Sequence, residues 1–574
     1  MKINDVKKIT GLTGKAIRLY ESKGLICVSR SENGYRSYTE KDVELLKEIK
    51  LFRSVGIPIS DIKLYLGGVI SLEELMEKRK AEILKESGKN SEKYRICESI
   101  SGNFSLEELE GSLSFTENES AKEKEYGTLT VGIDIGTTTV SASVYDIDNK
   151  EQVEAYTIPH NSYISSSRFS EQSVDVMMEK AQSLLNHILN SYKSIVSIGI
   201  SGQMHGVVYI DKDGAAVSDL MNWQDKRGDE LLENGKSVCQ IIYDITGERI
   251  STGYGIATHY YNMQKGLVPK GTVGLCTVMD FFCMKICGSK RTPTHASLGA
   301  SLGLFDVEKG CFMEDKLSLL GIAPGFLPEV TKKSIIVGKC RDIPVAVPVG
   351  DNQASFLGSV GNNDDCMLVN IGTGSQISAV SEEFVRTNDS LELRPFIEGK
   401  YLICGSALCG GFAYSMLEDF FKSYVASAGV QEEAQYKTIN RIAKEAYEKG
   451  EQGLLVDAFF CGKRSDPCVR GSIKMIDRSN FTPAALIIGV LKGMCNELYE
   501  LYEEMPVKKS QIVASGGAVR KNEILKSIIA DTFGSSVSAG TIKEVTSTGV
   551  SLFAALALGK IKYENGFLDY VRGE

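Results

Sequence analysis

Two similar hairpin patterns constrain the fold of this chain more than any other feature. The segment VGIDIGTTTVSASVYD begins at Val131 and MLVNIGTGSQISAVSE begins at Met367, with Thr137 and Thr373 at equivalent positions 236 residues apart. In each, an apolar strand leads into a Gly-Thr turn and a second strand follows. Such a repeat indicates a duplicated domain with a ligand in the cleft between the copies. The hairpins alone do not distinguish duplication from two unrelated Gly-Thr turns.

The chemistry of these turns favours phosphate. Glycine leaves room for backbone N–H groups to converge on an anion, and Thr hydroxyls add further donors. Asp134 ends the first strand, where we expect it to hold Mg²⁺ directly or through water. The other common phosphate site, a Walker P-loop, has no counterpart, because NGKS at Asn234 follows Glu230 where a glycine is required. The predicted phosphate-binding residues are Gly136, Thr137, Thr138, Gly372, Thr373 and Gly374.

Two short motifs fit a site for a polyhydroxylated substrate. SGQMHGVVYI begins at Ser201 and NWQDKR begins at Asn222, with the only Trp of the chain. Polar side chains beside an apolar wall bind hydroxyls selectively, since each buried hydroxyl partner left unpaired costs about 1–3 kcal/mol. A structural role is the simpler interpretation of His205 taken alone.

A third motif supplies a candidate catalytic base. In VAVPVGDNQASFLGS an apolar strand runs through Gly350 into Asp351 and a helix of small residues. A carboxylate at a helix N-terminus is kept ionised by the helix dipole. It is placed to take the proton of a substrate hydroxyl during phosphoryl transfer. Further along, ASGGAVRKNEIL begins at Ala514, and its paired glycines allow close approach of a flat nucleobase or ribose.

The first 66 residues differ in charge from the rest. They carry 13 Lys and Arg against 8 Asp and Glu, a net charge of +5 in a chain whose total is −9. Two short helices around a tight turn are expected, with Thr13 as N-cap of the second and Lys15 and Arg18 on its outer side. Asn33-Gly34 predicts a small hairpin, and Thr39 begins another helix. A helical domain with merely solvated basic residues is the alternative.

This order of parts resembles the MerR family of winged-helix transcription regulators over residues 1–68. The matching segments are GLI, NGYRSYTEKDVELL and LFRSVGIPISDIKLYL. The resemblance implies a double-stranded DNA operator as partner and a homodimer, although the helical connector and polar linker of residues 69–127 hold only a short apolar seam. The DNA-facing candidates that it implies are Lys15, Arg18, Tyr20, Arg36 and Tyr38.

Residues 128–565 together resemble the FGGY carbohydrate kinases, which have the actin-like duplicated ATPase fold. The resemblance implies MgATP as cosubstrate, Asp351 as catalytic base, Asp134 as the residue serving magnesium, and a sugar site that contains Gln203, Met204, His205 and Asp225. It also implies an adenosine motif formed by Gly516, Gly517, Ala518 and Asn522. Sedoheptulokinases are the most similar type and xylulokinases the next. The turn GTGSQ and Ser515 depart from the family pattern, so the sugar stays open.

The expected fold is therefore α/β, with duplicated actin-like (ribonuclease H-like) ATPase domains behind a mainly helical winged helix-turn-helix domain. The predicted boundaries are 1–68, 69–127, 128–347 and 348–574. Fourteen scattered Cys without a CxxC pair, and the lack of a signal or membrane segment, predict a cytoplasmic protein with no membrane contact. The leading hypothesis is an ATP-dependent kinase of a sedoheptulose-like ketose. The alternative is a sugar-sensing regulator whose kinase fold is not catalytic.

Overall fold

The computed structural model describes residues 1–26, 28–30, 36–87, 93, 97, 126–232, 235–363, 365–372, 374–429, 435–463, 466, 468–540, 542–563, 567 and 569–572. The chain divides into two compact units. One comprises residues 1–127 and 183–193, and the other comprises residues 128–182 and 194–574.

The N-terminal residues form short helices and one small hairpin. Its elements are α1 (Ile3–Thr10), α2 (Gly14–Ser22), β1 (Ser29–Arg30), β2 (Arg36–Ser37), α3 (Glu40–Ser54), α4 (Ile59–Leu66) and α5 (Leu72–Ser87). Strands β1 and β2 pair antiparallel, as expected for a wing. The predicted turn at Asn33-Gly34 lies outside the described residues, and so does most of the predicted linker.

Local signals set the helix ends in this unit. The Thr13 hydroxyl accepts a hydrogen bond from the Ala16 amide at 3.1 Å, which caps α2 as predicted. Thr39 and Asp42 form a reciprocal capping box at the start of α3. Because these contacts join residues close together in sequence, the sequence was sufficient to predict them.

The larger unit contains two mixed sheets, each built around an antiparallel hairpin with parallel strands added on one side. The first has the order β15-β16-β7-β3-β4-β5, with β17 also on β7, and the second has the order β20-β21-β19-β18-β24-β25. The strands of the first sheet are β3 (Leu129–Ile135), β4 (Thr139–Asp146), β5 (Glu151–Pro159), β7 (Ile195–Gly202), β15 (Ile336–Cys340), β16 (Ile343–Ala346) and β17 (Val349–Gly350). Those of the second are β18 (Cys366–Ile371), β19 (Ser375–Ser381), β20 (Leu391–Pro395), β21 (Tyr401–Ala407), β24 (Gln511–Ser515) and β25 (Ser536–Ala539).

Corresponding strands confirm the predicted duplication. Hairpin β3–β4 has its parallel neighbour β7, and hairpin β18–β19 has its parallel neighbour β24. The long helices are α8 (Val174–Ser191), α9 (Val238–Thr246), α10 (Gly255–Gln264), α11 (Val278–Cys287), α14 (Asp351–Val360), α15 (Gly411–Ser427), α16 (Tyr436–Glu448), α17 (Pro483–Glu504), α19 (Glu523–Phe533) and α20 (Val545–Ala557). Shorter elements are β6 (Glu171–Gln172), β8 (Val208–Asp211), β9 (Leu220–Met221), β10 (Thr272–Cys276), β11 (Thr294–His295), α12 (Ala296–Ser301), β12 (Phe305–Asp306), β13 (Cys311–Phe312), α13 (Glu314–Leu319), β14 (Val330–Thr331), β22 (Leu455–Asp457), β23 (Ser472–Lys474), α18 (Gly517–Lys521) and α21 (Asp569–Arg572).

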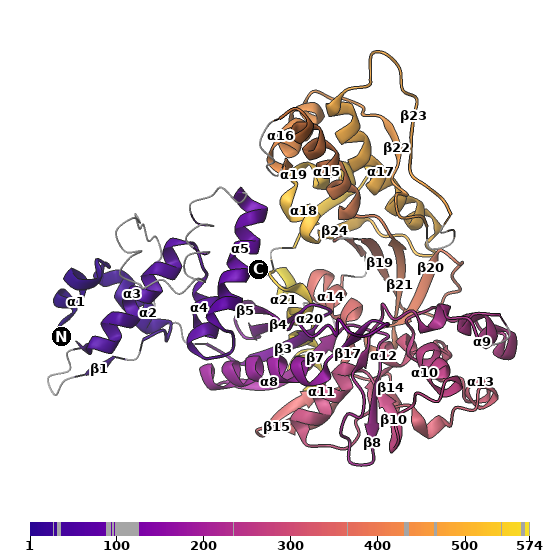
Figure 1. Cartoon of the computed structure of the whole chain (residues 1–574), viewed down its shortest axis with the longest axis horizontal. Helices are drawn as coiled ribbons and strands as arrows, with labels where there is room; N and C mark the ends of the chain where they lie inside the picture. Colours follow the sequence, from indigo (N-terminus) through magenta and orange to yellow (C-terminus); the bar gives the residue numbers. More distant parts are fainter. Residues whose placement is uncertain are drawn as a thin grey trace. The chain divides into compact units, whose positions relative to one another are not determined.

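Helices α14 and α20 pack against each other between the two sheets (Figure 1). Their crossing depends on glycines. A Cβ placed on Gly549 would lie 1.8 Å from the Ala354 carbonyl oxygen, and one on Gly358 would lie 2.3 Å from the Val545 carbonyl oxygen. Around this crossing, Leu357 and Phe553 belong to one buried cluster with strand residues of both sheets. The halves therefore share a core, so the helix crossing sets how they face each other.

We expect Gly549→Ala to lower the unfolding free energy of this unit by about 1–3 kcal/mol, because backbone atoms cannot move aside as a flexible side chain can. Thermal unfolding of the full chain measures the effect. Gly325→Ala is the control, since its added Cβ would meet no atom within 4 Å. Equal melting temperatures for the two variants would contradict the glycine-dependent crossing.

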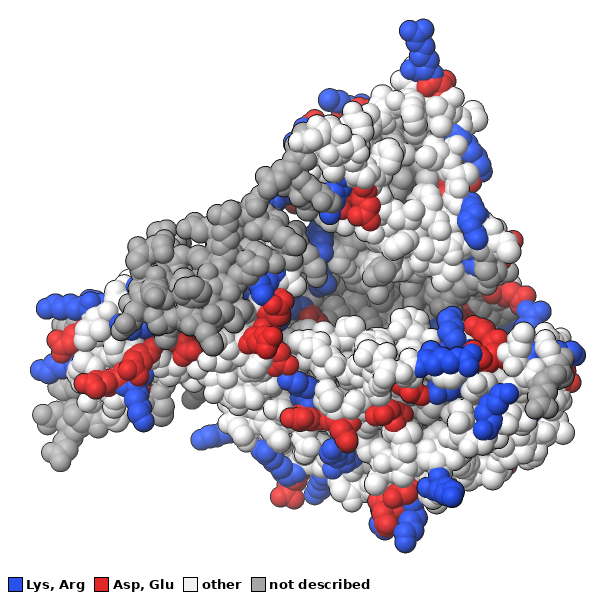
Figure 2. Space-filling model, in the orientation of Figure 1, with Lys and Arg blue, Asp and Glu red and all other residues white. Residues whose placement is uncertain are grey.

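Charged side chains of both signs lie on the face of the larger unit that Figure 2 shows. On the face seen in Figure 2, Lys and Arg are intermixed with Asp and Glu over the described surface of the larger unit. Among the described residues no helix is long and apolar enough to span a lipid bilayer.

Candidate active site

Neighbouring parallel strands bring the predicted motifs of the first sheet together. Strand β3 pairs with β7 so that Ile135 lies opposite Gly202, and β17 pairs with β7 so that Gly350 also lies opposite Gly202. The residues after each strand therefore emerge at one edge of the sheet. The first phosphate turn, the Gln203–His205 segment and Asp351 meet there, although far apart in sequence. No local sequence pattern predicts this register.

The first phosphate turn is a tight hairpin held at several points. The Gly136 amide donates to the Thr139 carbonyl oxygen at 2.9 Å. Thr137 is half-buried and Thr138 is exposed, so a ligand can reach both side chains. The Trp223 indole N–H donates to the Thr137 hydroxyl at 3.0 Å, which links the NWQD motif to this turn.

The second phosphate motif lies against a glycine pair that the sequence analysis missed. The Gly411 amide donates to the Gly372 carbonyl oxygen at 2.7 Å, and a Cβ on Gly410 would lie 2.5 Å from the Gly374 carbonyl group. Thr373 lies outside the described residues. The sequence signal that could have identified this pair is Gly-Gly between a strand and a helix, which also occurs in the motif that begins at Ala514.

The adenosine motif is adjacent to this second turn because β24 runs parallel to β18, with Ser515 opposite Asn370. Gly516 has φ +99°, and a Cβ there would lie 2.3 Å from the Ile371 carbonyl oxygen, so the position requires glycine. Gly517 begins α18, and its added Cβ would meet nothing within 4 Å. Ala518 lies 3.8 Å from the Cβ position of Gly411. The turn and the motif are thus brought together.

Asn522 has a structural contact in addition to its predicted role. It is 3% exposed, and its side-chain oxygen accepts from the Ile524 amide at 3.1 Å, which caps α19. Its amide nitrogen is buried without a partner among the described residues. Contact between Asn522 and a nucleotide stays a prediction. The strand end before the adenosine motif faces a cavity of about 530 Å³, whose lining includes Ser515, Gly516 and Glu544.

Asp134 lies near the end of β3, within electrostatic range of Asp351 and Glu544. Burial, together with the negative charges of Asp351 and Glu544, raises the pKa of Asp134 to about 8. Its Oδ1 atom is buried and has no hydrogen-bond partner among the described residues. A divalent cation beside this unpaired oxygen would offset the repulsion and favour the ionised form of Asp134. Among the described residues no three His, Cys, Asp or Glu are grouped so that they could hold a metal ion. Mg²⁺ usually binds one or two carboxylates together with water and substrate phosphates.

Asp351 is the first residue of α14. Burial raises its pKa to about 6, although the nearby Arg394 guanidinium and hydrogen bonds from Asn352 oppose the shift. The side-chain amide of Asn352 donates from Nδ2 to Asp351 Oδ1 at 3.0 Å. Desolvation thus opposes the predicted effect of the helix N-terminus and raises the pKa above the usual carboxyl range. A pKa of about 6 still leaves Asp351 mostly ionised at pH 7 and able to accept a proton.

A cavity of about 230 Å³ is bordered by Met204 and His205. The His205 backbone has φ +74°, a strained conformation for a residue with a side chain. Ser301 stabilises it: its hydroxyl accepts from the His205 amide at 3.2 Å, and its carbonyl oxygen lies 2.8 Å from Nδ1, which must then carry the proton. Tyr254 stacks on the imidazole with 4.4 Å between ring centroids. Strand β20 adds Arg394, a residue that the sequence analysis missed, to the cavity wall.

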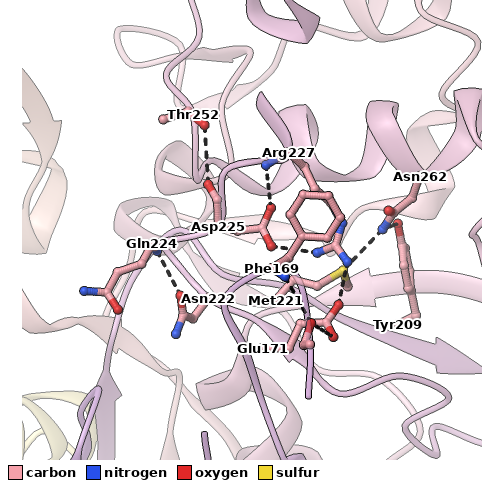
Figure 3. A network of polar contacts seen from close by, with 11 residues as sticks. Phe169, Glu171, Tyr209, Met221, Asn222, Gln224, Asp225, Arg227, Thr252 and Asn262 are labelled. Carbon is pink, nitrogen blue, oxygen red and sulfur yellow. Dashed lines mark hydrogen bonds and ion pairs between the residues drawn. The ribbon is translucent and has the colours of Figure 1, made fainter. Parts of the chain in front are cut away.

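Asp225 is part of a buried ion-pair network rather than of this cavity wall (Figure 3). Its Oδ2 accepts from Arg227 Nη1 at 2.7 Å and its Oδ1 from the Arg227 amide at 2.9 Å. Arg227 also pairs with Glu171 and lies over the Phe169 ring, 4.3 Å from its centroid. Burial raises the pKa of Asp225 to about 6 despite Arg227. The Asp225 carboxylate therefore holds the NWQD turn, and contact between Asp225 and a sugar stays a prediction. Gln203 does not line this cavity either.

The structure narrows the set of DNA-facing candidates. Lys15 and Arg18 are exposed on α2, as predicted. Tyr20 and Tyr38 are 0% and 2% exposed, so their predicted contact with DNA is wrong: both side chains pack inside the domain. Arg36 is partly exposed and forms an ion pair with Glu21 at 2.6 Å.

Comparison with known proteins agrees with this geometry. Residues 129–363 match the N-terminal domain and residues 367–558 the C-terminal domain of the FGGY family of carbohydrate kinases. Residues 1–68 match the MerR HTH family of regulatory proteins. Together these matches span most of the chain.

Individual relatives are distant but nearly full-length. A xylulose kinase of Staphylococcus xylosus is 25% identical over 460 residues, covering 74% of this chain and 90% of that protein. A sedoheptulokinase of Mus musculus is 23% identical over 450 residues, covering 71% and 93%. Among solved structures, a xylulose kinase from Rhodospirillum rubrum has a TM-score of 0.67 at 19% identity, covering 77% of this chain and 92% of that chain. At this identity the likeness establishes the fold alone.

Proposed function

Because the chain belongs to the FGGY family of carbohydrate kinases, and begins with a MerR-type helix-turn-helix domain, we propose that it phosphorylates a ketose with ATP and binds double-stranded DNA. The observation that carries the kinase proposal is the meeting of Asp351, Asp134 and the first phosphate turn at one edge of the sheet, beside a cavity lined by His205. Relatives named xylulose kinase and sedoheptulokinase support a ketose as substrate.

The proposed mechanism assigns one task to each group. Asp351 accepts the proton of the terminal hydroxyl as that oxygen attacks the γ-phosphorus, and the bond from this phosphorus to the β–γ bridging oxygen breaks to release ADP. The glycine turns at Gly136 and Gly372 donate backbone N–H groups to the phosphates. Asp134, with its buried unpaired oxygen, would hold Mg²⁺, which neutralises phosphate charge when bound. His205, fixed by Ser301 and Tyr254, orients the substrate hydroxyls beside Asp351.

A coupled ATP-consumption assay tests the proposal against sedoheptulose, xylulose, ribulose, fructose and glycerol. Turnover that depends on one ketose supports the kinase and names its substrate. Binding of a ketose without turnover would instead favour the alternative, a regulator whose kinase fold senses sugar. Asp134 and Asp351 argue against that alternative, because a sensor needs the pocket but not the base. Turnover of glycerol alone would overturn the choice of a ketose.

We expect kcat/KM for the ketose to depend on one ionisation near pH 6. Asp351 must be ionised to accept a proton, and burial raises its pKa to about 6. Saturating MgATP would keep Asp134 ionised, because the cation lowers the pKa of that carboxyl. The rate should therefore be level above about pH 7 and fall roughly tenfold per unit well below pH 6, as expected for titration of a single base. A pH–rate profile at saturating MgATP measures this. A profile that stays level down to pH 4.5 would contradict Asp351 as the base.

Lys15 and Arg18 are proposed to contact DNA phosphates or base edges. We expect Lys15→Ala and Arg18→Ala each to weaken binding to a 30-base-pair duplex of random sequence. If the side chain contacts a phosphate, each should also lower the slope of log K against log salt by about 0.9. Fluorescence anisotropy across a salt series measures both effects. Lys226→Ala is the control, because it removes one exposed positive charge from the kinase part. Equal loss in all three variants would indicate net charge rather than a binding face.

A further inference from the structure

Gln172 is a fully buried amide beside the proposed active site, in a part of the sequence without a recognised motif. It is 0% exposed and lies in β6, whose partner strand β9 leads directly into the NWQD turn. Successive side chains of a strand point to opposite faces. Glu171 accordingly bonds to Arg227 in the network of Figure 3, while Gln172 points away to a different set of partners.

All four hydrogen-bonding positions of the Gln172 amide are filled. Its Nε2 donates to the Thr137 carbonyl oxygen at 2.8 Å and to the Ser162 hydroxyl at 3.1 Å. Its Oε1 accepts from Gln203 Nε2 at 2.9 Å and from Asn222 Nδ2 at 3.1 Å. The side chain therefore bonds directly to the first phosphate turn, to the GQMH segment and to the NWQD turn.

Only an amide satisfies this arrangement. One side presents two acceptors and the other presents two N–H donors, so the Gln172 amide has a single compatible orientation. A carboxylate would accept from Gln203 and Asn222 but could not donate to the Thr137 carbonyl oxygen. Because the group is buried, water does not replace a lost bond.

We propose that Gln172 is a positioning residue that couples occupancy of the sugar site to the geometry of the first phosphate turn. The proposal rests on the proposed kinase function. A bound sugar that holds the segment of Gln203 and His205 in place also holds the Gln203 side chain, which donates to Gln172 Oε1. The same Gln172 amide donates through Nε2 to the Thr137 carbonyl oxygen in the phosphate turn. Bound sugar should therefore favour the phosphate-binding form of the turn, so that sugar and nucleotide bind more tightly together than alone.

The test exploits Trp223, the only tryptophan of the chain, whose indole bonds to Thr137. Its fluorescence is titrated with Mg²⁺ and the non-hydrolysable nucleotide AMP-PNP, in the absence and presence of the ketose identified by the assay panel. In the unmodified protein we expect the sugar to tighten AMP-PNP binding by at least about fivefold. In Gln172→Glu, measured at pH 8, the bonds to Gln203 and Asn222 remain and the Ser162 hydroxyl can turn to donate to the carboxylate, while the bond to the Thr137 carbonyl oxygen is lost. The tightening should then fall below about twofold, with sugar affinity nearly unchanged.

A merely structural role predicts a different result: both affinities fall while the ratio between them is kept. Gln172→Met removes all four bonds and serves if the Glu variant does not fold. Gln240→Glu, an exposed glutamine on α9, is the matched control and should behave like the unmodified protein.

Failure of the kinase proposal and failure of this inference give separate results. If no sugar binds the unmodified protein, the proposed function fails. AMP-PNP alone still tests Gln172, since its affinity should fall several-fold in Gln172→Glu when the turn loses its support, without a matching fall in the melting temperature. Unchanged nucleotide affinity in that variant, or sugar-dependent tightening retained at the level of the unmodified protein, would overturn the role of Gln172.

Discussion

Asp351→Asn should reduce ketose-dependent ATP consumption by at least about 100-fold while leaving the protein folded. The amide has nearly the shape of the carboxylate but cannot accept the hydroxyl proton. Burial raises the pKa of Asp351 to about 6, which means that folding disfavours its ionised form. Replacing the charge should therefore leave the melting temperature equal or higher at pH 7. A large loss of activity together with preserved stability would mark Asp351 as a catalytic residue.

The assay pairs kcat with direct binding of AMP-PNP, which should change little in Asp351→Asn. Asp213→Asn is the control, an exposed carboxylate that pairs with Lys290 at the surface. Two results would contradict the assignment. One is residual turnover above a tenth of the original rate, and the other is a loss of activity explained by a lower melting temperature.

Arg227→Met should destabilise the larger unit by about 3–5 kcal/mol, because it leaves the carboxylate of Asp225 buried without its partner. The Asp225 side chain is 0% exposed, and both of its oxygens are bonded to Arg227. The pair also fixes the turn that carries Trp223, so the affinity for the sugar should fall as well. Thermal unfolding and sugar titration measure the two effects.

The double variant Arg227→Met with Asp225→Asn distinguishes two causes of the lost stability. One is the lost attraction of the ion pair, and the other is the buried charge left without a partner. If the unpaired charge is the cause, the double variant should be more stable than Arg227→Met alone. Arg249→Met is the matched control: its ion pair with Asp389 has both side chains more than three-quarters exposed, and such pairs contribute little. A loss of stability in Arg249→Met comparable with that in Arg227→Met would contradict the argument from burial.

Because one chain joins a MerR-type domain to an FGGY kinase, DNA binding and sugar binding can be tested for coupling in the same protein. The N-terminal residues match a regulator family and the remainder matches a kinase family. If the kinase proposal holds, repeating the DNA titration with sugar and AMP-PNP shows whether occupancy of the kinase alters DNA affinity. By linkage, DNA should then alter nucleotide affinity by the same factor.

The sequence alone determined the features that depend on neighbours in the chain. The caps at Thr13 and Thr39, the hairpin around Gly136 and the start of a helix at Asp351 all arise from contacts within a few residues, and the structure confirms them. The repeated hairpins also indicated the duplicated fold. These signals need no knowledge of distant contacts, because turn and cap geometry follows from local backbone chemistry.

Only the tertiary structure decided which side chains meet. Burial of Tyr20, the ion pair of Arg227 with Glu171, and the raised pKa of Asp351 depend on elements remote in sequence. Gln172 is the clearest case, since no sequence motif marks it. Its side chain forms four hydrogen bonds only because β6 pairs with β9 and β3 pairs with β7. Strand register and desolvation are properties of the assembled sheet. They therefore appear only when segments separated by tens to hundreds of residues pack together.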